Sequence, residues 1–150
     1  MLFHTHILLG IVLFLITKNF FTGNDYIAFF LVLLGSILPD IDSHNSKINK
    51  WSGIIGRIIV IFTKHRGLFH SLLFHALLFI VMLYYFNIYY ATALFVGYLA
   101  HLIGDGITPR GIKLFYPFSN FRIKGPIKVG GWFESLIMVL LFVLILVKLF

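Results

Sequence analysis

Residues 88–105 read IYYATALFVGYLAHLIGD, an apolar run that ends in a histidine, His101, and a carboxylate, Asp105. Residues four apart on a helix share a face, with their Cβ atoms about 6 Å from each other. The stretch therefore predicts a helix whose end presents two kinds of metal ligand on one face. Taken alone, the same spacing also fits a simple His–Asp hydrogen bond at a helix end.

The rest of the chain is similarly apolar. Of its 150 residues, 60% are hydrophobic and 11% are charged, and the mean hydropathy is +1.00. Soluble domains contain about 45–50% apolar residues, so this composition excludes an ordinary soluble globule and indicates a membrane protein. The chain has no cysteine, which excludes disulfides and Cys-based zinc sites and leaves His, Asp and Glu as metal ligands.

Five apolar segments organise the chain, and they cover residues 7–21, 26–39, 68–86, 88–104 and 132–147. Most are shorter than the roughly 20 helical residues that span a bilayer, so they must tilt, thin the bilayer or stop short of one surface. Residues 53–62 are apolar but contain Arg57, which favours a short interfacial helix. We therefore expect an all-α fold, a polytopic membrane bundle of about five membrane helices plus a short interfacial helix, forming a single membrane-embedded domain over residues 1–150.

The basic residues indicate the orientation in the membrane. If the segments alternate in direction, ten of the twelve Lys and Arg residues fall in two loops, residues 40–67 and 105–131, on the side of the N-terminus. The positive-inside rule then places the N-terminus and both loops in the cytoplasm of a multi-pass plasma (inner) membrane protein. The first segment lacks the features of a cleaved signal peptide, so we expect it to be retained. The net charge of +7 is explained by topology and contact with anionic membrane lipids, and nucleic-acid binding is not expected.

Histidines and carboxylates gather at the segment ends on this same side. Segments that are distant in the chain thus deliver imidazole and carboxylate groups to one level, as a hydrolytic site with two or three metal ions requires. These residues are His4 or His6, between which the sequence does not choose, then Asp40 and Asp42, His65 and His70, His101 and Asp105, and finally Glu134.

Three further features depend on local geometry. On an ideal helix His65 and His70 would point about 140° apart, so they share a site only if His65 lies in a preceding turn, which Gly67 favours. Arg66 is expected to meet a phosphate oxygen or a transition-state charge, with a lipid headgroup contact as the alternative. His75 lies deeper and off the face of His70, which favours a hydrogen bond in the bundle interior.

Several motifs in order resemble a known family. They are THILLG (5–10), LPDIDS (38–43), HRGLFHSLL (65–73), GYLAHLIGDGITPRGIKLFYP (97–117) and a basic loop that ends at Glu134. Together they resemble the YdjM-like family of LexA-regulated, inner-membrane metal-dependent hydrolases. The resemblance implies a distant similarity to zinc-dependent phospholipase C and related nucleases, which are helical enzymes with a cluster of zinc ions. It also implies a ligand set of His6, Asp40, His65, His70, His101, Asp105 and Glu134, with Asp42 and Arg66 inside matching motifs.

We therefore expect a membrane-bound metal-dependent hydrolase that activates water with two or three divalent ions, zinc first and manganese or iron as alternatives. Asp40 or Asp42 is the expected general base, and Arg66 is the third expected catalytic residue. A phosphoester or phospholipid-like substrate is favoured by the resemblance, while ester and amide hydrolysis stay open. The alternatives are a metal-ion or proton transporter and a non-enzymatic membrane adaptor. The sequence leaves the substrate, the metal and the oligomeric state open.

Overall fold

The computed structural model describes residues 1–20, 23–63 and 65–150, and these residues form an all-helical fold. The predicted all-α class is thus confirmed. Phe21, which ends the first predicted segment, and Lys64, which the charge count includes, lie outside the described residues, as does Thr22. Across the described ranges, β structure is limited to one antiparallel bridge between Ile112 and Ile123.

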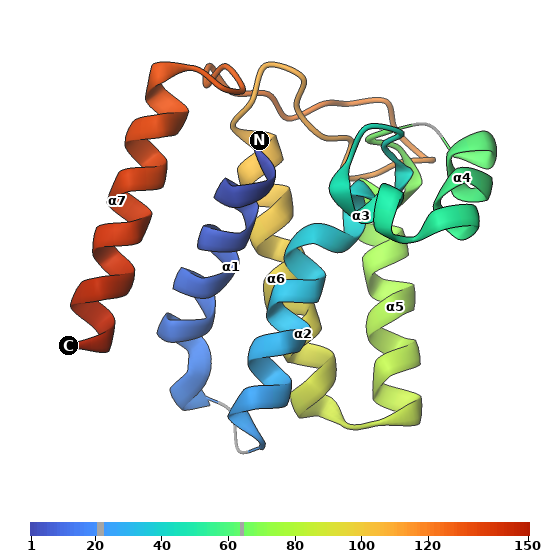
Figure 1. Ribbon diagram of the computed structural model, residues 1–150. Coiled ribbons are helices and arrows are strands. Elements are labelled where there is room, and N and C mark those ends of the chain that lie inside the picture. The colour runs from blue at the N-terminus through green and yellow to red at the C-terminus, as the bar shows by residue number, and fades with distance from the viewer. Residues whose placement is uncertain (21–22, 64) are drawn as a thin grey trace.

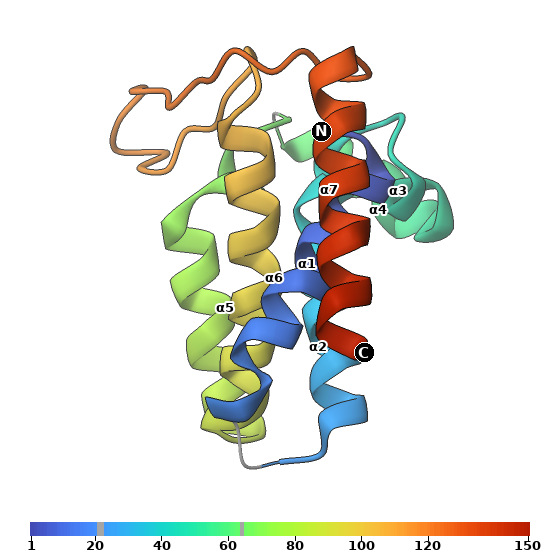
Figure 2. The same ribbon diagram turned by 90° about the vertical axis from the view of Figure 1, so that its left-hand side faces the viewer.

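Five long helices lie next to one another and alternate in direction (Figures 1 and 2). The alternation brings the starts of the first, third and fifth of these helices to the same end of the bundle as the ends of the second and fourth. This arrangement is the one that the alternating apolar segments predict. The helices are α1 (Phe3–Thr17), α2 (Asp25–Ile37), α5 (Leu72–Tyr85), α6 (Ile88–Gly106) and α7 (Trp132–Leu149).

Short helices fill the first long loop. The chain continues from α2 into the 3-10 helix Leu38–Asp42, then α3 (Lys47–Trp51) and α4 (Gly53–Phe62), and the 3-10 helix Leu68–His70 precedes α5. α4 has the bounds predicted for the short apolar helix. The side-chain amide of Asn49 donates to the carbonyls of Ile41 and Gly56, at 2.6 and 2.7 Å, and so ties α3 and α4 to the 3-10 helix that follows α2.

α6 is the central helix of the bundle and packs against α1, α2 and α5. Its closest neighbour is α2, because glycines allow the two backbones to touch. A Cβ atom at Gly97 would lie 2.0 Å from the carbonyl oxygen of Val32, and one at Gly35 would lie 2.4 Å from that of Leu94. Such small residues at helix interfaces are typical of membrane bundles.

Asparagine side chains start two helices at the far end of the bundle. The carboxamide oxygen of Asn24 accepts hydrogen bonds from the backbone of Tyr26 and Ile27, and that of Asn87 accepts one from Tyr90 at 3.0 Å. These caps satisfy backbone N–H groups that have no partner within the helix. The two asparagines thereby mark the starts of α2 and α6.

α7 stands at the edge of the bundle, where it contacts α1 (Figure 1). Its apolar side chains are mostly exposed. By length and composition, α7 is the one described helix that could cross a bilayer unaided, and α1, α4 and α5 are shorter apolar helices.

Candidate metal centre

Four side chains from three chain-distant elements meet at the end of the bundle where the loops gather. Asp40 comes from the 3-10 helix after α2, His70 from the 3-10 helix before α5, and His101 and Asp105 from the last turns of α6. One ligand atom of each lies within 4.8 Å of the others, and the two histidines and Asp105 are fully buried. The structure therefore brings His and Asp side chains from the ends of distant segments together, as the sequence predicts.

The distances within this first donor group suit a metal ion. The Nε2 atoms of His70 and His101 are 3.2 Å apart, and the Nε2 of His70 is 3.6 Å from the Oδ2 of Asp105. The Nε2 of His101 is 3.9 Å from the Oδ1 of Asp40. Ligand atoms about 2.0–2.1 Å from a tetrahedral zinc ion lie about 3.3 Å from each other. The two histidine nitrogens already have this spacing, whereas the contacts of Asp40 with both histidines, at 3.9 and 4.0 Å, would have to shorten around an ion.

The other ring nitrogens hold the two imidazoles in a suitable orientation. The Nδ1 of His101 lies 2.8 Å from the carbonyl oxygen of Ser36, and because a carbonyl only accepts, this nitrogen carries the proton. In a neutral ring, Nε2 then presents its lone pair to the donor group. The Nδ1 of His70 lies 3.4 Å from the Oδ2 of Asp42. Metal-binding histidines in general have such a carbonyl or carboxylate partner on the second nitrogen.

A second donor group adjoins the first and consists of Asp42, His65 and His70. The Oδ1 of Asp42 lies 2.8 Å from the Nδ1 of His65, and its Oδ2 accepts a hydrogen bond from the backbone of Arg66 at 3.2 Å. His65 lies in the turn before the 3-10 helix. The predicted condition for His65 and His70 to face one site is therefore met.

The electrostatics of the centre favour positive charge. Burial by itself lowers the pKa of His70, but Asp105 and Asp42 outweigh it and raise this pKa to about 9. Burial would raise the pKa of Asp42, yet its hydrogen bond with His65 and the nearby ring of His70 leave that pKa below its ordinary value. Surroundings that stabilise a proton on His70 also stabilise a metal cation bound in its place, so this centre suits a cation.

His6 borders the first donor group, whereas His4 does not. The ring of His6 stacks on that of His101 with centroids 4.0 Å apart, and its Nε2 is 3.4 Å from the Oδ1 of Asp105. Gly104 makes room for this ring, because a Cβ atom there would lie 3.0 Å from it. The buried Nδ1 of His6 has no hydrogen bond to any described residue. His4 is exposed, so of the two histidines only His6 lies beside the donor group, and its role as a ligand stays a prediction.

Glu134 is buried near the centre but belongs to neither donor group. Each of its carboxylate oxygens accepts a backbone hydrogen bond of 2.6 Å, one from Leu2 and one from Gly130. The glutamate thereby ties the start of α7 to the start of α1. Its role as a metal ligand stays a prediction.

Arg66 connects the two donor groups through its backbone and its side chain. Its φ of 61° lies in the left-handed region, which non-glycine residues rarely adopt. One guanidinium nitrogen lies 2.7 Å from the Oδ2 of Asp105, and another donates to Thr108 and Gly111 at 3.0 Å. The turn that the sequence predicts at Gly67 is present, but its left-handed residue is Arg66. The contacts of the Arg66 side chain hold this strained backbone in place.

His75 differs from its prediction. It is buried as expected, between the rings of Phe95 and Tyr98 with centroid distances of 4.3 and 3.9 Å. Neither ring nitrogen forms a hydrogen bond with the described residues, so the predicted interior hydrogen bond is wrong. Aromatic neighbours, which offer no hydrogen-bonding group to this ring, surround it instead.

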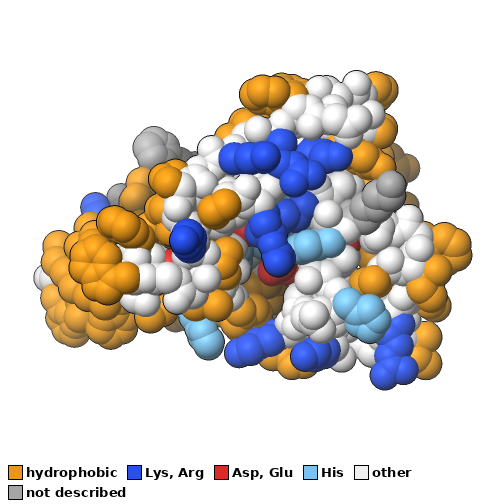
Figure 3. All heavy atoms as spheres, turned by 90° about the horizontal axis from the view of Figure 1, so that it is seen from above, with side chains coloured by type: hydrophobic (Ala, Val, Ile, Leu, Met, Phe, Trp, Pro, Cys, Tyr) orange, Lys and Arg blue, Asp and Glu red, His pale blue; other side chains and the backbone are white. Residues whose placement is uncertain are grey.

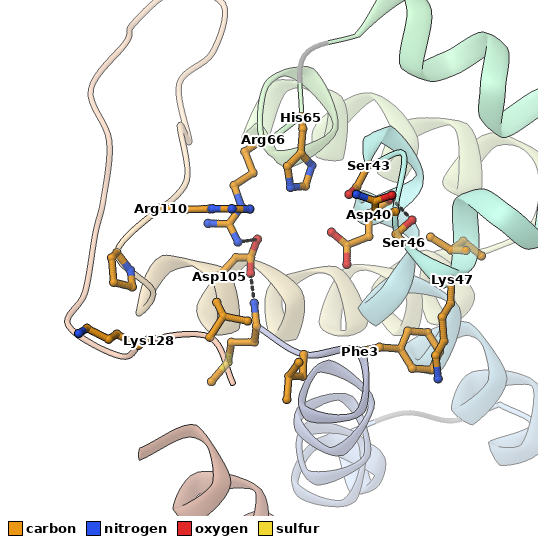
Figure 4. A pocket seen from close by; sticks show the side chains of 16 residues that line it. Phe3, Asp40, Ser43, Ser46, Lys47, His65, Arg66, Asp105, Arg110 and Lys128 are labelled. Atoms are coloured by element: carbon orange, nitrogen blue, oxygen red, sulfur yellow. Dashed lines mark hydrogen bonds and ion pairs between the residues drawn. The ribbon is translucent and has the colours of Figure 1, made fainter. Parts of the chain in front are cut away.

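A cavity of about 560 Å³ opens above the centre. Figure 3 shows Lys and Arg side chains around this hollow, with acidic and His side chains visible inside it. In Figure 4 the carboxylate of Asp40 points across the cavity toward Arg66 and Arg110, which lie close together beside Asp105. From the sequence, Arg110 is only one of the ten basic residues that indicate topology, although it follows Asp105 closely in the chain. The cationic side chains that line the cavity are Lys47, Arg66, Arg110 and Lys128.

The fold and the site define a class, namely apolar helical proteins with a buried His–Asp donor centre at one end of the bundle. The chain belongs to the YdjM family of inner membrane proteins, whose family model matches residues 1–149. This confirms the family that the sequence motifs resemble.

Individual relatives agree with this assignment. The chain is 32% identical over 120 residues to the inner membrane protein YdjM of Escherichia coli and to that of Shigella flexneri, covering 74% of this chain and 61% of each relative. It is 31% identical over 108 residues to the uncharacterized protein YvsG of Bacillus subtilis, covering 70% of this chain and 67% of that protein. The matched region therefore spans about three fifths of the YdjM proteins' own length. No solved structure matches the chain.

Proposed function

We propose that this protein is a membrane-embedded, metal-dependent hydrolase of phosphoesters. The observation that carries the proposal is the combination of a buried donor group, formed by Asp40, His70, His101 and Asp105, with a cationic cavity directly above it. A phosphoester needs a cationic site for its anionic oxygens and an activated water molecule for its cleavage. The donor group and the cavity supply both requirements.

In this proposal the five long helices cross the membrane, with the centre at the cytoplasmic interface. The two long loops, which carry nine described Lys and Arg residues, lie at that end, in agreement with the positive-inside rule (Figure 1). α5 has 14 residues and is therefore about 21 Å long, so the bilayer must thin or the helix must stop short of one surface. The exposed isoleucines of α4, including Ile54 and Ile61, suit the headgroup boundary.

The two donor groups would hold the metal ions. Asp40, His70, His101 and Asp105 would bind the first ion, with His6 beside it, and Asp42 with His65 would bind a second. A divalent ion held there supplies a Lewis acid that polarises a phosphoryl oxygen and makes water more acidic. Imidazole and carboxylate ligands suit zinc first, and also manganese and iron.

The contacts that Asp40, Asp42 and the two arginines already make indicate which of them could act as general base or bind substrate. Both oxygens of Asp42 contact neighbouring N–H groups. Asp40 would offer one oxygen to the first ion, and because its half-buried carboxylate faces the cavity, its other oxygen is the better placed general base. Arg66 is held by Asp105 and Thr108, and it contributes fixed positive charge. Arg110 is exposed beside it and is free to bind a substrate oxygen.

Hydrolysis of bis(4-nitrophenyl) phosphate and of phospholipid vesicles by the detergent-purified protein tests the proposal. We expect turnover that a chelator abolishes and that zinc or manganese restores. Arg110→Gln should raise the KM about tenfold, as expected when one charge-assisted hydrogen bond is lost, without changing metal content. Arg57→Gln, an exposed arginine outside this cavity, is the matched control. A metal-loaded protein inactive on both substrates would overturn the proposed reaction.

A further inference from the structure

A second cavity, of about 450 Å³, lies between α6, the start of α5 and the loop that follows α6. It shares no lining residue with the cavity above the metal centre. Eight of its eleven lining residues are Leu or Ile and two are Gly, so Lys124 is the single polar side chain among them. Its volume lies in the range of about 300–1,000 Å³ that ligand-binding pockets occupy.

The wall that the loop contributes is fixed by backbone hydrogen bonds. Ile112 and Ile123 exchange two such bonds, of 2.9 and 3.0 Å, and the backbone of Leu72 donates to that of Leu114 at 2.8 Å. The N–H of Gly125 donates to the turn after α6 at 3.1 Å. The groove is therefore preformed, and these backbone groups are not available to pair with a peptide.

The groove opens on an apolar surface. Figures 1 and 2 show the loop between α6 and α7 above the start of α5 and the end of α6. Ile103 and Ile123, which line the groove, are 52% and 40% exposed, and the adjoining face of α5 exposes Leu73 and Leu77. In the membrane placement proposed above, on which this step depends, the groove faces the acyl chains and Lys124 lies at the headgroup level.

We propose that this groove binds one acyl chain of an anionic phospholipid, whose phosphate pairs with Lys124. Apart from Lys124, the lining is aliphatic, without aromatic or hydrogen-bonding side chains, which fits a hydrocarbon chain. No carboxylate lines the groove among the described residues, so the ammonium group of Lys124 is available to a phosphate. The groove is a lipid site separate from the metal centre and does not depend on hydrolysis.

Native mass spectrometry of the chelator-treated protein, released from detergent with added dioleoyl phosphatidylglycerol or dioleoylglycerol, tests this site. We expect the wild type to retain one phosphatidylglycerol molecule. Leu99→Trp, which fills the groove, should weaken retention of both lipids about tenfold or more. Lys124→Gln should weaken the retention of phosphatidylglycerol about tenfold and leave the retention of dioleoylglycerol unchanged. Val143→Trp, on the exposed face of α7, should bind as the wild type does.

Retention of both lipids by Leu99→Trp at wild-type strength would overturn the proposal, as would equal binding by Lys124→Gln and the wild type. If Leu99→Trp lowers the thermal stability, Ile123→Trp fills the groove from the loop instead, with the same expected result. Because the lipids are measured without metal and without turnover, the result is independent of whether the metal centre hydrolyses phosphoesters.

Discussion

The Nε2 atoms of His70 and His101 face each other at 3.2 Å, although 31 residues separate the two histidines in the chain. The carbonyl of Ser36 and the carboxylate of Asp42 lie against the opposite nitrogens of these rings. Two buried imidazoles oriented in this way, with Asp40 and Asp105 beside them, form a site that a cation stabilises.

Gly97→Ala tests the contact between α2 and α6. The added methyl group would lie 2.0 Å from the carbonyl oxygen of Val32, so the helices must separate. We expect the free energy of unfolding to fall by about 3 kcal/mol, measured by thermal unfolding in detergent. Gly106→Ala is the control, because its methyl group meets nothing closer than 3.6 Å. Equal stability of Gly97→Ala and the wild type would contradict this packing.

Arg66→Met tests the ion pair with Asp105. Without the guanidinium group, the buried carboxylate of Asp105 has less positive charge beside it. We therefore expect the free energy of unfolding of the chelator-treated protein to fall by about 3 kcal/mol. Added zinc should reduce this loss, because the metal supplies the missing positive charge. The difference in Tm from the wild type is measured with and without zinc, with Arg57→Met as the exposed control. A loss that zinc leaves unchanged would argue against metal binding at Asp105.

His65→Ala tests whether the second donor group holds its own ion. His65 belongs to the group with Asp42 and not to the group with Asp105. We expect isothermal titration calorimetry with zinc to show two binding events in the wild type and one in the variant. Exposed His44 lies outside both groups, so His44→Ala should keep both events. Two unchanged events in His65→Ala would show that His65 is not a ligand.

Glu134→Gln separates a structural role from ligation. Both carboxylate oxygens accept backbone hydrogen bonds, and an amide nitrogen would face one of the two N–H donors. We therefore expect a loss of about 2 kcal/mol in stability, measured by thermal unfolding, with metal content unchanged. Ser135→Ala, one residue further along α7, should be nearly neutral. Loss of metal from Glu134→Gln would instead support the ligand role that the sequence predicts.

Much of the bundle and its polar end could be predicted from the sequence. Apolar runs mark the long helices, and alternation of direction places His101, Asp105 and the His65–His70 pair at one end, as the structure has them. The helix at residues 53–62 was also predicted, because a short apolar run with one arginine is typical of an interfacial helix.

Other features depend on tertiary contacts that one sequence does not contain. The left-handed backbone at Arg66 results from its contacts with Asp42, Asp105 and Thr108, whereas local propensity favours Gly67. The entry of Arg110 into the cavity depends on the turn after α6, and the tautomer of His101 depends on Ser36 across the interface with α2.

Metal analysis of the detergent-purified protein tests the central claim most directly. Inductively coupled plasma mass spectrometry should find zinc, manganese or iron in the wild type. The double variant His101→Ala, Asp105→Ala should lose the ion of the first donor group. The double variant His44→Ala, Asp25→Ala, which removes the same residue types outside both groups, should retain it. A wild type that carries no such metal, binds none when it is added, and unfolds at the same temperature with and without chelator would contradict the account.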